Sequence, residues 1–185
     1  MITKFKTKQL IFITLIGVLL FLMELLIATV LDVIIGVPGA GFLVVIIFFG
    51  ALAVVGGLVV RKFGTFTLRS LIYSVLAIPT PVFGPPGFYK VLAALVVGLF
   101  ADVMVSIFGY RKIGYYLGLV IGNLMGLVFF AAAFVWLGFP ESNQILSQFW
   151  FLFILYAIEA AIGVWLGFWI YGKIKNKKVV REISN

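Results

Sequence analysis

The chain contains no cysteine and no histidine among its 185 residues. The absence of cysteine excludes disulfide bonds and thiolate nucleophiles, and the absence of histidine excludes histidine-based catalytic triads. Together the two absences remove the usual ligands of zinc and haem. We therefore expect neither a metal site nor a cofactor.

Charge is also scarce. Charged residues make up 11% of the chain, whereas hydrophobic residues make up 64% and the mean hydropathy is +1.28. A soluble domain carries roughly 25% charged residues. So few charged residues cannot cover a surface that is exposed to water, and we therefore expect lipid to surround the protein. We also expect one compact domain over residues 1–185.

Long apolar runs separated by short connectors divide the chain into candidate membrane spans. A span needs about 20 apolar residues, and the runs do not alternate with the period of two that membrane strands require. The sequence thus predicts an all-α membrane protein, a bundle of six transmembrane helices. Their approximate ranges are 9–31, 41–60, 65–82, 88–109, 113–138 and 148–171.

The basic residues indicate an orientation. If all six segments cross the membrane, twelve of the fourteen lysines and arginines fall on one side, and Lys90 with Asp32 and Glu141 falls on the other. The positive-inside rule then places both termini in the cytoplasm of a multi-pass cell-membrane protein. The twelve residues are Lys4, Lys6, Lys8, Arg61, Lys62, Arg111, Lys112, Lys173, Lys175, Lys177, Lys178 and Arg181.

The connector "IPTPVFGPPGFYKV" (Ile78–Val91) interrupts the apolar pattern with four prolines and two glycines. Pro79 and Pro81 are expected to end or kink the third span, and "GPPG" predicts a tight reversal. Tyr89 and Lys90 then stand at the outer mouth of the fourth span. The connector is either a hairpin with interfacial anchors or part of a lid over an outward-facing pocket.

Four ionisable residues fall inside the predicted spans, where they are costly and usually face a bundle interior or a cavity. Arg69 lies one turn from the cytoplasmic side, and snorkelling to the headgroups explains it. Glu24, Asp102 and Glu159, with Asn123, fall at similar depths. They either join helices through hydrogen bonds or line a pocket for a cationic or hydrogen-bond-donating ligand.

Aromatic residues near the span ends form an interfacial belt or, in part, stack on a flat ligand. Combined with the polar residues, they give a predicted substrate-binding set. Its members are Glu24, Tyr89, Lys90, Asp102, Asn123, Trp136, Tyr156 and Glu159.

Glycines recur every four residues in "GYYLGLVIGNLMG", at Gly114, Gly118, Gly122 and Gly126. Such a face allows two helix backbones to approach closely. The sequence therefore predicts tight packing of the fifth span, either within the bundle or against another protein.

The run "GLFADVMVSIFGYRK" (Gly98–Lys112) and the preceding "FGPPGFYK", within six predicted spans, resemble the substrate-binding S component of an energy-coupling factor (ECF) vitamin transporter. The resemblance implies capture of a vitamin in an outward-facing pocket and docking onto a transmembrane coupling subunit with two ATPases. It also implies no enzymatic activity in this chain, which carries no phosphate-binding G-x-x-x-x-G-K-[ST] motif. The Ala-x-x-x-Ala docking pair of that family is missing from the first span, so Gly17, Ala53 and Gly57 are the expected docking residues.

The acidic and aromatic candidates favour thiamine or its pyrimidine precursor as the ligand, with riboflavin next. Two alternatives stay open at this point. The chain could be a small intramembrane enzyme that acts on lipid or prenyl headgroups, or it could be a membrane scaffold.

Overall fold

A computed structural model of the chain describes residues 4–35, 40–82, 84–140 and 142–184, and all regular structure in these ranges is helical. The first helix, α1 (Thr7–Met23), continues through a π-helical turn, η1 (Glu24–Ala28), into α2 (Thr29–Ile35). The remaining helices are α3 (Ala40–Val60), α4 (Thr65–Ala77), α5 (Tyr89–Ile107), α6 (Lys112–Trp136), α7 (Ser142–Ser147), α8 (Phe149–Ile174) and α9 (Lys178–Ser184).

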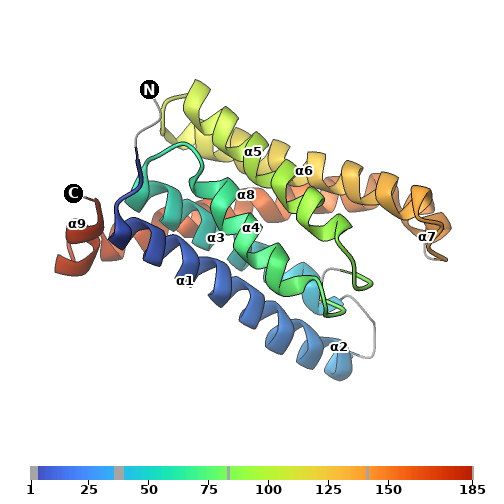
Figure 1. The fold of residues 1–185 in the computed structure, drawn as a ribbon. Coiled ribbons are helices and arrows are strands. Elements are labelled where there is room, and N and C mark those ends of the chain that lie inside the picture. The colour runs from blue at the N-terminus through green and yellow to red at the C-terminus, as the bar shows by residue number, and fades with distance from the viewer. Residues whose placement is uncertain (1–3, 36–39, 83, 141, 185) are drawn as a thin grey trace.

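The long helices pack side by side (Figure 1), and the contacts among six of the described helices close into a ring. Going round the ring, α1 contacts α4, α4 contacts α5, α5 contacts α6, α6 contacts α8, α8 contacts α3, and α3 returns to α1. The short helices α2, α7 and α9 lie at the ends of this bundle. A closed ring of helices leaves an interior that every one of the six can reach.

Among the residues that the structure describes, four helical segments are long and apolar enough to cross a membrane: Thr7–Ile27, Tyr89–Ile107, Lys112–Trp136 and Phe149–Ile174. The stretch Val44–Val60 of α3 and the whole of α4 are apolar but shorter. At 1.5 Å per residue, the 13 residues of α4 extend about 20 Å, less than the roughly 30 Å of a bilayer core. The structure thus supports a helical membrane protein, and the count of six spans remains a prediction.

The third predicted span, 65–82, is too long. The helix ends at Ala77, five residues early, and the chain then turns through the proline-rich connector. Proline lacks the N–H that a helix needs and disfavours helical geometry in the residue before it, so Pro79 ends the helix as expected. Phe83 of this connector lies outside the described residues.

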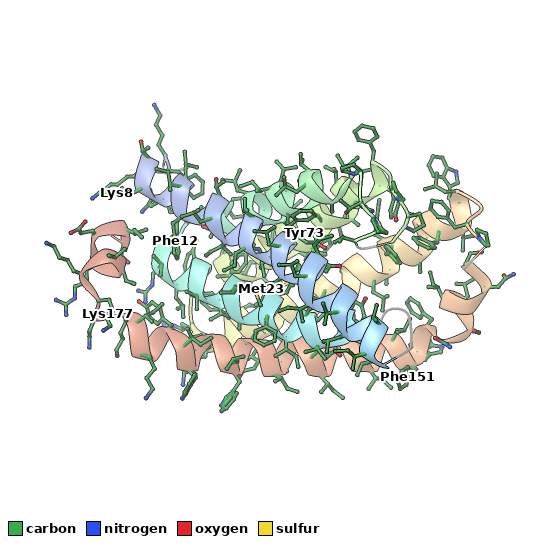
Figure 2. The ribbon with its side chains drawn as sticks, turned by 90° about the horizontal axis from the view of Figure 1, so that it is seen from below. Lys8, Phe12, Met23, Tyr73, Phe151 and Lys177 are labelled. Carbon is green, nitrogen blue, oxygen red and sulfur yellow. The ribbon has the colours of Figure 1, made fainter. Side chains whose placement is uncertain are left out.

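Both termini lie at the same end of the bundle (Figures 1 and 2). Lys8 forms an ion pair with Glu182 at 3.3 Å, and the Gln9 side chain donates a hydrogen bond to the Ile183 carbonyl. The α3–α4 and α5–α6 connections reach this end too, whereas α2, α7 and the α4–α5 connection lie at the other. One end therefore gathers the basic residues that flank the helices, while Glu141 lies outside the described residues.

Glycines bring the ring's helices together. A Cβ added at Gly118 or Gly122 would lie within 3.0 Å of a carbonyl oxygen of α5, and Gly114 and Gly126 face Phe108 and Val97. The predicted tight packing of the fifth span is therefore confirmed, with α5 as its partner. On the opposite side Gly163 of α8 meets the backbone of α3 at Gly50.

Candidate functional site

The ring encloses a central cavity. The cavity has a volume of about 80 Å³, several times the roughly 10–15 Å³ that one water requires. Every helix of the ring contributes to its wall, and most of the wall is apolar. The wall comprises Leu20, Ile46, Phe49, Gly50, Ala53, Arg69, Ser70, Tyr73, Ala94, Val97, Leu119, Asn123, Gly126, Leu127, Phe130 and Tyr156.

Arg69 supplies the charge in this wall. It is only 7% exposed, so it does not snorkel to a headgroup layer as the sequence suggested. The short α4 and the close packing of Gly17 of α1 against the Arg69 carbonyl hold this part of α4 inside the bundle. The guanidinium donates from Nη1 to the Phe49 carbonyl at 3.2 Å and from Nη2 to Ser70 Oγ at 3.3 Å. Its buried Nε has no hydrogen-bond partner within the described ranges.

Tyr73 lies one turn further along α4 and also lines the cavity. Its hydroxyl donates a short hydrogen bond to the carboxylate of Glu24, which is buried where α1 widens into the π-helical turn. Figure 2 shows Tyr73 inside the bundle, between the end that carries Lys8 and Lys177 and the end near Phe151. Glu24 therefore reaches the cavity through Tyr73 rather than as part of its wall.

Of the predicted substrate-binding residues, Asn123 and Tyr156 line the cavity. Asn123 follows Gly122 on α6, beside the glycine face that packs on α5, so its side chain turns inward. Tyr156 enters from α8 and interacts electrostatically with Glu24 and Glu159. The cavity wall thus contributes the guanidinium of Arg69, the phenols of Tyr73 and Tyr156, the amide of Asn123 and the hydroxyl of Ser70.

Asp102 is buried but does not belong to the wall. Its two carboxylate oxygens accept hydrogen bonds from the backbone N–H groups of Phe66 and Thr67, at 3.2 and 2.8 Å, and from the Thr67 hydroxyl at 2.7 Å. These are N–H groups of the first turn of α4, which have no partner within their own helix. Asp102 therefore joins α5 to the start of α4.

Lys90 is fully buried, at 0% exposure. Its ammonium donates to the carbonyls of Ala77, Thr80 and Val82 at 3.0, 2.6 and 2.6 Å. An ammonium has three donors, so these contacts use all of them. Lys90 fastens the proline-rich connector to α5 and has no donor left for a ligand.

Glu159 of α8 is buried at 6% exposure, outside the wall of the cavity. Its Oε2 has no hydrogen-bond partner among the residues that the structure describes. Nor do three carboxylates gather anywhere in the described chain closely enough to hold one metal ion. Of Asp102, Asn123 and Glu159, the cavity wall includes Asn123 and neither acid, so the pocket alternative gains no support for the two acids.

Tyr89 and Trp136 belong to a second, wider hollow at the end away from the termini. It lies between the start of α5 and the end of α6 and is lined almost entirely by apolar side chains. Tyr89 donates to the Pro85 carbonyl at 2.8 Å and packs against Phe130 and Phe134, whereas Trp136 is 86% exposed. These two predicted residues are separate from the central cavity.

The expected docking residues also lie inside the bundle. Gly17 packs against α4, Gly57 packs against Phe66 and Tyr115, and Ala53 lines the cavity. Their small size is used within the ring, so they offer no surface to a partner in this arrangement.

The sequence does not indicate the roles of Arg69, Ser70 and Tyr73 in this wall. They follow one another at positions i, i+1 and i+4 on α4, and the spacing from Arg69 to Tyr73 indicates a shared helix face. An arginine, a serine and a tyrosine within a segment of only 13 residues were the available signal. This signal is weak in the sequence alone, because snorkelling to the headgroups explains an arginine near the end of a span more simply.

The chain matches no protein-family model, and no curated protein or solved structure is significantly similar to it.

Proposed function

We propose that this protein binds a small solute in its central cavity as the substrate-capturing membrane subunit of an importer. The observation that supports this most is the cavity itself, which six helices enclose and which contains Arg69, Tyr73, Asn123 and Tyr156. Buried polar groups in a membrane protein are costly and commonly mark a ligand pathway or pocket. Concave, mostly apolar pockets with a few convergent polar groups are the usual form of small-molecule sites.

The kind of importer is proposed from the resemblance to ECF S components. In that arrangement all six helices cross the cell membrane and the basic end faces the cytoplasm, in line with the positive-inside rule. The transmembrane coupling subunit and two ATPase subunits then supply the energy, and this chain hydrolyses nothing. The coupling subunit would have to contact residues other than Gly17, Ala53 and Gly57.

The vitamins favoured from the sequence were thiamine or its pyrimidine precursor, and riboflavin. The cavity wall gives no support to a cationic ligand, because its charged member is Arg69 and no carboxylate belongs to it. A cation there would meet a like charge in a medium of low dielectric constant. We therefore propose that the transported vitamin-like solute is not a cation.

The test is binding without ATP by the purified chain in lipid nanodiscs. Thermal unfolding is followed with each member of a B-vitamin panel, and at least one should raise the unfolding temperature. The variant Ala94→Leu adds side-chain volume to the cavity wall and should weaken that binding by about tenfold or more. Ala132→Leu, the same change on the exposed face of α6 beside the outer hollow, should leave it intact.

A panel that stabilises nothing would overturn the proposed function. Binding that is lost in Ala132→Leu and kept in Ala94→Leu would move the site to the outer hollow.

A further inference from the structure

We infer that the solute held in the central cavity is a monocarboxylate whose carboxylate group binds Arg69, an inference that rests on the proposed function and specifies its ligand. Three features of the cavity wall support it: the donors that Arg69 leaves unused, the absence of a carboxylate from the wall, and the apolar surface of most other wall residues.

A guanidinium carries five N–H donors in a planar fork that matches the two oxygens of a carboxylate. Two donors of Arg69 are used, on the Phe49 carbonyl and on Ser70 Oγ, and both bonds are long at 3.2 and 3.3 Å. The Nε donor is buried and unused within the described residues.

Arg69 forms no ion pair with any residue that the structure describes. Asp102 interacts electrostatically with Arg69, but its oxygens bond the first turn of α4. Glu24 bonds the hydroxyl of Tyr73. A buried guanidinium without a direct ion-pair partner is expensive, so an anionic ligand would supply the partner that Arg69 lacks.

A ligand with one negative charge fits the central cavity better than a ligand with two. Arg69 brings a single positive charge, and Glu24 is already close behind Tyr73. A doubly charged phosphate would leave excess negative charge in a low-dielectric interior, whereas a carboxylate balances Arg69. Asn123 and Tyr156 supply further hydrogen bonds, and Phe49, Leu127 and Phe130 supply apolar surface for the rest of the molecule.

The first experiment needs no ligand. Unfolding temperatures of the empty protein are compared for wild type, Arg69→Met and Arg111→Met, an exposed arginine at the start of α6. If Arg69 is retained for a ligand, Arg69→Met removes a buried charge that has no direct ion-pair partner and unfolds at a higher temperature than wild type. Arg111→Met should change little. A marked fall for Arg69→Met would show that Arg69 supports the fold, and would overturn the inference.

The second experiment uses pairs of compounds that differ in the carboxylate: nicotinate and nicotinamide, biotin and biotinamide, pantothenate and panthenol. Wild type should bind one of the acids at least about tenfold more tightly than its neutral partner, the usual effect of a charge-assisted hydrogen bond. In Arg69→Met the preference should fall below about threefold. In Arg69→Lys, which keeps the charge but loses the planar fork, it should be intermediate.

The outcomes separate this inference from the proposed function. If riboflavin, thiamine or a neutral partner binds at least as tightly as any acid, and Arg69→Met does not alter that binding, the ligand inference is wrong while the binding function stands. If neither these compounds nor the wider vitamin panel bind, the proposed function and the inference both fall.

Discussion

Two cationic side chains are buried in the part of the chain that the structure describes, and they are used in opposite ways. Lys90 is 0% exposed and directs all three of its donors at carbonyl oxygens of the last residue of α4 and of the α4–α5 connector. Arg69 is almost as deeply buried, yet it makes two long hydrogen bonds, lines a cavity and leaves Nε without a partner in the described chain. Burial alone therefore does not identify a site, whereas a buried side chain that lines a cavity and keeps an unused donor does.

Asp102 of α5 and Glu159 of α8 show the same contrast between a buried group with all its partners and one that lacks a partner in the described chain. Asp102 accepts three hydrogen bonds from Phe66 and Thr67 and so fixes the start of α4. Glu159 has an oxygen with no partner among the described residues. A buried polar group that is fully satisfied stabilises the fold, and one that is only partly satisfied lowers its stability.

Lys90→Met should have the largest effect on stability. It removes three hydrogen bonds and leaves the carbonyls of Thr80 and Val82 without their partner, which we expect to cost about 3 kcal/mol or more. The measurement is thermal unfolding in nanodiscs, with Lys112→Met at the exposed start of α6 as the control. Arg69→Met is expected to stabilise the empty protein. Equal shifts in unfolding temperature for Lys90→Met and Arg69→Met would therefore contradict the distinction between the two side chains.

Asp102→Asn and Glu159→Gln make the same chemical change in the two acids. Asp102→Asn places N–H groups against the donors of α4 and should cost about 1–2 kcal/mol. Glu159→Gln removes a partly satisfied charge and should change stability by less than about 0.5 kcal/mol or raise it. Both are read from the shift in unfolding temperature. A larger loss for Glu159→Gln than for Asp102→Asn would mean that the hydrogen-bond inventory does not predict which acid supports the fold.

Gly122→Ala tests the α5–α6 contact next to the cavity and should lower the stability by less than Lys90→Met does. The added Cβ would lie 2.8 Å from the Val97 carbonyl, so α5 and α6 must separate, at about 1–2 kcal/mol. Gly172→Ala is the matched control, since nothing lies within 4 Å of its Cβ, and it should be neutral or stabilising. Equal unfolding temperatures for the two variants would show that the α5–α6 contact yields easily.

Much of the architecture was predictable because composition and repeats determine it. The helical class, the approximate helix ranges and the tight face of Gly114, Gly118, Gly122 and Gly126 all follow from hydropathy and spacing. The end of α4 was placed too late, because an apolar run does not show where the proline-rich connector begins to turn.

The site was less predictable, because a sequence does not show which neighbour each polar group meets. Asp102 and Lys90 had the same appearance as ligand residues, and only their contacts with α4 and its connector show their role. Arg69 was dismissed for its position near a helix end. Its inward orientation depends on the packing of α1 against α4 at Gly17, a contact between residues far apart in the chain.

The most direct test of the central claim is an experimental structure of the protein loaded with the acid that stabilises it most. The account predicts ligand density inside the ring of helices, with the carboxylate within hydrogen-bond distance of Arg69 Nε and the rest of the molecule against Asn123 and Phe130. Ligand density beside Trp136 in the outer hollow, or a central cavity that stays empty in the presence of saturating ligand, would contradict it.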